Sequence, residues 1–215
     1  MSVLRAAGAS RLDDVVARLR AAASDVGVRR SGQRTRGDHD LNPGLWAEKP
    51  LTAAAVLVPI IAHPDQLTVL LTRRTAHLHD HAGQISFPGG RVEPEDASHA
   101  DAALREATEE VGLPAERVAV LGELAPYETV TGYRVTPIVG WVEPPFALTP
   151  DPVEVADVFE VPLAFLLEPQ NQQRHFRMLG ELRRDFWAIP YGERYIWGAT
   201  AAMLMILDRT LRAVD

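Results

Sequence analysis

Three glutamates stand at i, i+3 and i+4 in the sequence: Glu106, Glu109 and Glu110. On a helix, these side chains would project within an arc of about 100° and would repel one another. Hard divalent cations such as Mg²⁺ and Mn²⁺ prefer oxygen ligands, and carboxylates one helical turn apart can share one ion or bridge two. The pattern predicts a metal site, with a solvated acidic helix face as the alternative interpretation.

A glycine turn, Pro88-Gly89-Gly90, precedes the acidic segment. Glycine lets the backbone approach a metal ion or a phosphate closely, and the carbonyl of Gly90 is the candidate to complete the metal shell. A cation held here would attract a diphosphate and neutralise charge as a phosphorus–oxygen bond breaks. The two features together predict phosphoryl chemistry.

Start and stop signals predict a helix over residues 99–111. Ser98 and Asp101 fit a capping box, and Gly112 followed by Pro114 fits a C-terminal stop. The glutamates are predicted to lie on one side of this helix and apolar residues on the other, with Arg105 between the two sides. The predicted apolar side comprises Ala100, Leu104, Ala107, Thr108 and Val111.

The run from Arg105 to Leu113, Arg-Glu-Ala-Thr-Glu-Glu-Val-Gly-Leu, together with the preceding Gly90, resembles the Nudix box. The resemblance implies a Nudix hydrolase in which Glu106 and Glu110 are the principal metal ligands and Glu109 is a third. It also implies a structural role for Arg105, which would pair with an upstream carboxylate. The spacing from Gly90 to Arg105 is 105 − 90 = 15 positions, one more than in the family pattern. The partner of Arg105 therefore stays open among Glu93, Glu95 and Asp96.

Residues 70–90 resemble the motif of the coenzyme A pyrophosphatase branch of this family, and residues 129–137 and 196–201 agree with it. The resemblance covers roughly residues 53–212 and implies hydrolysis of the diphosphate of coenzyme A or its thioesters. The products would be 3′,5′-ADP and 4′-phosphopantetheine or its acyl form. His79 stands where the branch has an arginine, which removes a permanent cation from this segment.

The candidate substrate-binding residues are Arg73, Arg74, His81, Gly89, Gly90 and Tyr133. Solvated strand-end arginines, a polar loop around the histidines and, less favoured, a zinc site are the alternatives. Stacking on adenine competes with ordinary core packing for Tyr127, Tyr133, Phe186 and Trp187. Glu154 is the candidate for an additional metal ligand or general base, against an exposed acid at a strand end.

The elements that must position these residues indicate an α+β fold. The predicted strands are residues 53–62, 67–72, 84–87, 117–125, 134–142, 156–161, 174–179 and 184–189. A second helix is predicted over 198–212, apolar around much of its circumference. Its predicted roles are core packing, a homodimer contact, or both. The family resemblance implies an α/β/α sandwich with a mixed sheet.

Residues 1–50 are predicted to form an N-terminal helix, over residues 11–23, and a polar linker over 27–44. The folded Nudix domain is predicted to span residues 51–215.

Composition bounds the function classes. The 215 residues carry a net charge of −7, which disfavours nucleic acid as a partner. No apolar run reaches the length of a membrane span, so no membrane partner is expected. The sequence has no cysteine, which excludes disulfides and thiol catalysis and fits a cytoplasmic location.

The expected partner is a small-molecule substrate. ADP-ribose or a dinucleotide is the rival substrate, and a non-catalytic metal- or nucleotide-binding module is the rival class.

Overall fold

The computed structural model describes residues 17–18, 21, 36–77 and 83–213. Within them, nine strands form one mixed sheet in the order β1-β7-β8-β2-β3-β4, in which β5 also pairs with β2, β6 with β8 and β9 with β3. The strands of this sheet are β1 (Arg36–Gly37), β2 (Thr52–Ala62), β3 (Leu67–Arg74), β4 (Ile85–Ser86), β5 (Gly89–Arg91), β6 (Val118–Glu123), β7 (Tyr127–Glu128), β8 (Tyr133–Val142) and β9 (Val155–Pro162). A second, antiparallel sheet comprises β10 (Gln173–Leu179), β11 (Leu182–Tyr191) and β12 (Arg194–Trp197).

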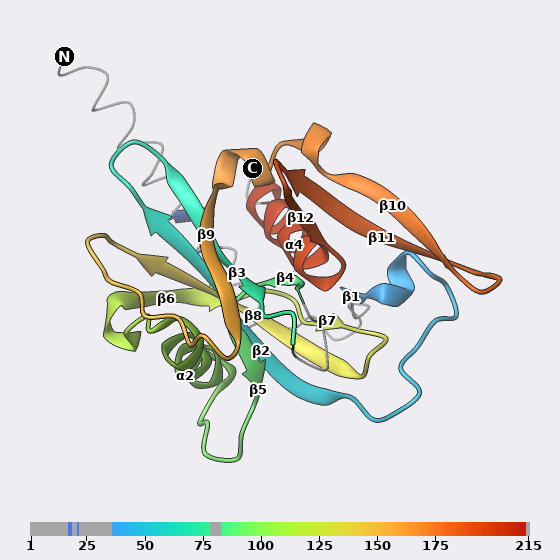
Figure 1. Cartoon of the computed structure of the whole chain (residues 1–215), viewed down its shortest axis with the longest axis horizontal. Helices are drawn as coiled ribbons and strands as arrows, with labels where there is room; N and C mark the ends of the chain where they lie inside the picture. The colour runs from blue at the N-terminus through green and yellow to red at the C-terminus, as the bar shows by residue number, and fades with distance from the viewer. Residues whose placement is uncertain (1–16, 19–20, 22–35, 78–82, 214–215) are drawn as a thin grey trace.

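Two long helices cover opposite faces of the large sheet (Figure 1). They are α2 (His99–Val111) and α4 (Ala199–Arg212). Shorter helical segments are α3 (Leu163–Leu166), η1 (Asp38–Asp40), η2 (Ala115–Arg117) and η3 (Pro169–Asn171).

The central strand β2 explains the layering. Its side chains alternate between two cores, because successive residues of a strand point to opposite faces. Leu57 and Ile61 pack in the cluster with α2, whereas Val58 and Ile60 pack in the cluster with α4. The result is an α/β/α sandwich with a mixed sheet, since β2 runs parallel to β8 and antiparallel to β3. The predicted α+β class is confirmed.

The helices predicted over residues 99–111 and 198–212 and the longer strands are confirmed within a few residues at each end. The short elements β5, β7, β12 and α3 were not anticipated. The strand β5 occupies the glycine turn: Gly89 pairs with Val56 and Gly90 with Ala55.

Part of the segment predicted to be linker is ordered. Arg36 in β1 pairs with Tyr127 in β7, and Asp38 accepts hydrogen bonds from the Tyr127 hydroxyl at 2.7 Å and the Val130 amide at 2.8 Å. The Asp38 carboxylate and the pairing of β1 with β7 therefore attach residues 36–38, which precede the predicted domain, to the large sheet. The predicted helix over residues 11–23 lies almost entirely outside the described residues.

The helix α4 is buried against its own chain. Leu204, Leu207 and Leu211 are each at most 7% exposed and belong to the core cluster beneath the large sheet. Core packing accounts for the apolar surface of this helix, and homodimerisation stays a prediction. No helix in the described part of the chain is long and apolar enough to cross a membrane.

Candidate active site

Local signals fix both ends of α2 and so fix the positions of its glutamates. The Ser98 hydroxyl accepts a hydrogen bond from the Asp101 amide at 3.1 Å, which satisfies one amide of the first turn. Gly112 ends the helix in the left-handed conformation, with φ of 68°, and its amide donates to the carbonyl of Thr108.

The buried side of α2 differs from the predicted one. Thr108, predicted to be on the apolar side, is exposed, and Glu110, predicted to lie opposite, is only 5% exposed. The residues that this helix buries are Ala102, Ala103, Ala107, Glu110 and Val111. The small alanines let the helix approach the sheet closely, and this orientation directs Glu110 towards β5.

Arg105 joins α2 to the loop that precedes it. Its Nε and Nη2 donate to the two carboxylate oxygens of Asp96 at 3.1 and 3.0 Å, and Nη2 also donates to the carbonyl of Arg91 at 3.1 Å. Among the three carboxylates left open by the sequence, Asp96 is therefore the partner. The Arg105 guanidinium lowers the pKa of Asp96 below its usual range.

The same guanidinium contacts two of the glutamates. Nη1 of Arg105 lies 3.0 Å from Oε1 of Glu106 and 3.1 Å from Oε2 of Glu109. The Glu109 side chain is 59% exposed, whereas that of Glu106 is 18% exposed. Arg105 thus orients the acidic face and Glu109 lies at its solvent edge.

Glu110 contacts the first residue of β5 and the last residue of β3. Its Oε2 accepts a hydrogen bond from the Gly89 amide at 3.3 Å, and its Oε1 lies 3.5 Å from Nη1 of Arg74. Burial raises the pKa of Glu110 to about 7, although Arg74 and the Gly89 amide both favour the ionised form. A buried carboxyl with so high a pKa indicates a site where added positive charge would be stabilising.

Glu106 and Glu154 complete this group of acids. Burial raises the pKa of Glu106, and the negative charges of Glu109 and Glu154 raise it further against the opposing effect of Arg105. Glu154 immediately precedes β9; its Oε2 lies 3.8 Å from Nη2 of Arg74, and its side chain is 45% exposed. The structure thus brings the candidate Glu154 beside the helix carboxylates, with Arg74 between it and Glu110.

The donor set fits Mg²⁺ or Mn²⁺ in its chemistry, because it consists of carboxylate oxygens and a nearby backbone carbonyl. Two of the carboxyls are desolvated and mutually repulsive, so a cation would relieve an unfavourable arrangement. In the described part of the chain, no three acidic or histidine side chains already converge into a cluster that could hold a metal ion. Arg74 and Arg105 instead contact several of the carboxylate oxygens. Binding of a cation would therefore require the glutamate side chains to exchange these contacts.

A cavity of about 490 Å³ opens beside this acidic group. Of the predicted substrate-binding residues, the structure places Arg74, Gly89, Gly90 and Tyr133 in its wall. Arg73 is exposed and is not part of the lining, because its side chain and that of Arg74 point to opposite faces of β3. His81 lies outside the described residues.

The aromatic and basic residues in the wall of this cavity differ in part from those predicted. Phe186 lines the cavity, but Tyr127 and Trp187 do not. Tyr127 is buried against Asp38, and Trp187 packs partly buried on the core. The basic and aromatic lining residues that were not among the predicted site residues are Phe87, Arg91, Arg177, Arg184 and Trp197.

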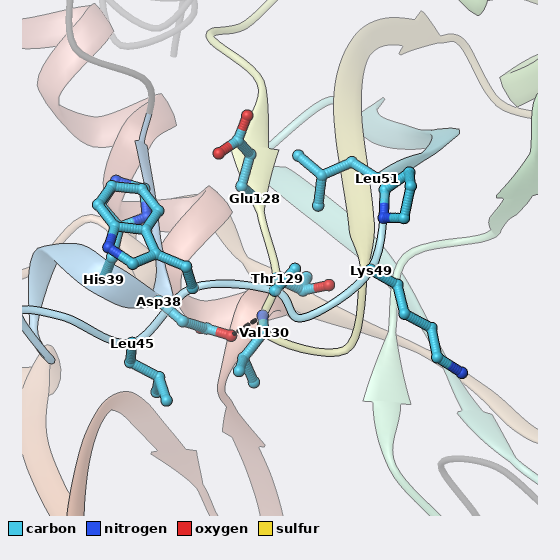
Figure 2. A pocket seen from close by; sticks show the side chains of 11 residues that line it. Asp38, His39, Leu45, Lys49, Leu51, Glu128, Thr129 and Val130 are labelled. Atoms are coloured by element: carbon cyan, nitrogen blue, oxygen red, sulfur yellow. Dashed lines mark hydrogen bonds between the residues drawn. The ribbon is translucent and has the colours of Figure 1, made fainter.

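A smaller hollow of about 200 Å³ adjoins this cavity at Asp38 and Val130 (Figure 2). His39 stacks on Trp46 beside it, with ring centroids 4.1 Å apart. In Figure 2 the Asp38 carboxylate points to the backbone amide of Val130. The α2 glutamates are not part of the lining of either cavity, but the larger one is lined by Arg74 and Gly89, which contact Glu110, whereas the smaller hollow is not.

The sequence profile of the NUDIX domain matches residues 51–182. The chain belongs to the NUDIX family. An uncharacterized Nudix hydrolase NudL from Pectobacterium atrosepticum is 44% identical over 179 residues, covering 79% of this chain and 88% of that protein. The NudL of Photorhabdus laumondii is 46% identical over 158 residues, covering 70% and 80%. Among solved structures, the Nudix hydrolase RenU of M. smegmatis is 25% identical, with a TM-score of 0.47 over 56% of this chain and 79% of that one.

Family membership confirms the predicted enzyme class, a Nudix pyrophosphatase. Nudix hydrolases generally use divalent metal ions such as Mg²⁺ or Mn²⁺ and bind small nucleotide substrates. Of the predicted metal ligands, Glu106, Glu109 and Glu110 lie on α2, and Gly90 lies on β5 next to Glu106 and in the cavity wall.

The two glycines of β5 give a prediction that separates folding from catalysis. A Cβ on Gly90 would lie 2.4 Å from Oε1 of Glu106, the flexible end of a side chain. A Cβ on Gly89 would lie 2.4 Å from the backbone oxygen of Ala55, and φ of Gly89 is 155°. We expect Gly90→Ala to keep most of its stability but to lose about 100-fold in kcat, because Glu106 is displaced. We expect Gly89→Ala to be destabilised by about 2–4 kcal/mol.

Urea denaturation and steady-state kinetics on both glycine variants check this expectation. A Gly90→Ala enzyme with unchanged kcat would show that the position of the Glu106 carboxylate is unimportant for turnover. A Gly89→Ala variant as stable as Gly90→Ala would contradict the proposed backbone strain.

Proposed function

We propose that this Nudix enzyme hydrolyses the diphosphate of coenzyme A or its thioesters to 3′,5′-ADP and 4′-phosphopantetheine or its acyl form. The observation that carries the proposal is the position of the segment resembling the coenzyme A pyrophosphatase motif. Within residues 70–90, the cavity is lined by Arg74, Gln84, Ile85, Ser86, Phe87, Gly89 and Gly90. Because Arg74 and Gly89 of this segment also contact Glu110, a substrate diphosphate bound to them would lie next to the acidic group.

Glu106, Glu109 and Glu110, with the Gly90 carbonyl, would hold Mg²⁺ or Mn²⁺ in this proposal. When bound, the metal polarises the diphosphate and lowers the pKa of the attacking water. Arg74 binds the same diphosphate from the cavity side, since its guanidinium is already placed between Glu110 and Glu154.

Water attacks phosphorus, the bridging phosphorus–oxygen bond breaks, and each product leaves with a terminal phosphate. We assign acceptance of the water proton to the Glu154 carboxylate, which is the more exposed acid beside Arg74. Arg105 positions Glu106 through their 3.0 Å contact and does not contact the substrate.

The proposal predicts the products of a substrate panel. Purified enzyme in Mg²⁺ or Mn²⁺ would be given coenzyme A, acetyl coenzyme A, ADP-ribose and a diadenosine polyphosphate, with products identified by mass spectrometry. We expect kcat/KM to be at least about 10-fold higher for the coenzyme A compounds, with 3′,5′-ADP as a product. Higher kcat/KM for ADP-ribose or the dinucleotide would replace coenzyme A as the substrate class. Metal and nucleotide binding without turnover would indicate a non-catalytic module.

A further inference from the structure

Two arginines face each other on the small sheet at the wall of the large cavity. Arg177 of β10 is the register partner of Arg184 in β11, so their side chains emerge on the same face. Both arginines line the cavity, together with Phe186 and Trp197. Two permanent positive charges directly opposite each other in a sheet are unfavourable unless an anion lies between them.

Neither arginine has an ion-pair partner among the described residues. The Nε of Arg184 is buried and contacts no hydrogen-bond acceptor in the described structure. The Arg177 guanidinium lies over the ring of Trp197, 5.4 Å from its centroid. A buried donor of this kind costs stability when it stays unpaired, so its position indicates a bound acceptor.

The arginines on the opposite face of the same strands behave differently. Arg174 and Arg183 both contact the Asp185 carboxylate, at 3.3 and 3.0 Å. Asp185, the acid nearest to Arg184 in sequence, also contributes to the cavity lining, but these two contacts already compensate its charge. Of these four arginines on β10 and β11, the two that line the cavity are therefore the two without an ion-pair partner among the described residues.

The aromatic residues beside the pair suit a nucleotide base. Phe186 and Trp197 pack edge to face, with ring centroids 5.2 Å apart, and both contribute to the lining. Aromatic faces stack on bases, and a guanidinium binds phosphate oxygens through two parallel N–H donors. The charge and the rings together match a nucleoside carrying a phosphomonoester.

We propose that Arg177 and Arg184 bind a phosphomonoester of the nucleotide substrate, separate from the diphosphate that is hydrolysed. This inference rests on the proposed function, in which the phosphomonoester is the 3′-phosphate of coenzyme A. The pair is a specificity determinant: it selects substrates that carry this extra phosphate and takes no part in bond cleavage.

Binding of product-like nucleotides tests the pair without turnover. Calorimetry in EDTA would compare adenosine 3′,5′-bisphosphate with adenosine 5′-monophosphate. We expect the wild type to prefer the bisphosphate by about 10-fold or more, and Arg177→Gln and Arg184→Gln to lose that preference. The matched control is Arg183→Gln, since Arg183 lies on the opposite face of β11 and its side chain is 58% exposed. Equal affinity of the wild type for both nucleotides, or an equal loss in the Arg183 variant, would overturn the proposal.

Kinetics on coenzyme A and 3′-dephospho-coenzyme A provide the second test. We expect Arg184→Gln to lower kcat/KM for coenzyme A by about 10- to 100-fold, mainly through KM, and to leave dephospho-coenzyme A nearly unaffected. An equal loss on both substrates in a variant with wild-type circular dichroism and Tm would overturn the assignment. If the wild type hydrolyses neither compound, the proposed function fails, while the calorimetry still decides whether the pair binds a phosphomonoester.

Discussion

Glu106→Gln is expected to lower kcat by about 10²–10³-fold at saturating Mg²⁺ while the domain stays folded. Glutamine has nearly the same shape as glutamate, and its amide oxygen can still accept the 3.0 Å hydrogen bond from Arg105. What is lost is the negative charge, which a divalent cation needs from its ligands. The substitution therefore removes the negative charge of this ligand without opening a cavity in the domain.

Steady-state kinetics with the best substrate of the panel would measure this loss, and calorimetric titration with Mn²⁺ would measure the accompanying loss of metal affinity. The matched control is Glu116→Gln, because Glu116 is an exposed acid of η2, outside the group of acids around Glu110. A Glu106→Gln enzyme with wild-type kcat and wild-type Mn²⁺ affinity would remove Glu106 from the metal site.

Much of the fold was predictable because the strongest patterns in the sequence are also the physically dominant ones. The continuous apolar run in β2 is buried on both faces, and the caps at Ser98 and Gly112 fix the helix ends locally. The short strand β5 buries few side chains and is formed by pairing with β2, which is distant in sequence. Such pairing leaves no periodic signal in the sequence.

The position of Glu110 could not be predicted for a related reason. A helical projection counts a carboxylate as polar and assigns it to the solvent side. Glu110 is instead buried because Gly89 supplies an amide donor and Arg74 supplies a charge, and both lie far from it in sequence. The choice of Asp96 over Glu93 and Glu95 as the partner of Arg105 likewise depends on a local fold: Asp96 also accepts a hydrogen bond from the Glu93 amide at 2.8 Å.

The pairing of β10 with β11 was not predicted, although the sequence contains a signal for it. Leu179 pairs with Leu182, so only Gly180 and Glu181 connect β10 to β11, and φ of Gly180 is 62°. A two-residue hairpin turn fixes the register of both strands, and that register places Arg177 opposite Arg184. Recognition of the turn would have paired the two arginines from the sequence alone.

Glu110→Gln is expected to abolish most turnover and, at the same time, to stabilise the metal-free protein at pH 8. The pKa of Glu110 is raised from 4.5 to about 7 in the folded protein. Because the folded state binds the proton more tightly than the unfolded state, this carboxyl favours folding below about pH 4.5. That contribution to stability is lost as the pH rises through about 7. Glutamine does not ionise, so the variant keeps its stability over the same pH range.

The expected gain is about 1–2 kcal/mol at pH 8, or about 3–6 °C in Tm, which allows for the weaker contact of an uncharged amide with Arg74. Thermal unfolding in EDTA at pH 5 and pH 8 would measure it, with Glu116→Gln as the control. We expect the difference between Glu110→Gln and wild type to shrink at pH 5. A variant less stable than wild type at both pH values would contradict the raised pKa of Glu110.

Addition of Mg²⁺ should reverse the order of the two proteins at pH 8. The wild type gains stability because the cation binds the folded state and compensates the buried charge of Glu110. The variant lacks that charge and should gain much less. If Mg²⁺ stabilises the wild type and the variant equally, the cation binds without Glu110. The buried carboxylate of Glu110 would then have no role in metal binding. A reversal would mean instead that this position trades stability of the metal-free domain for affinity toward the ion that hydrolysis requires.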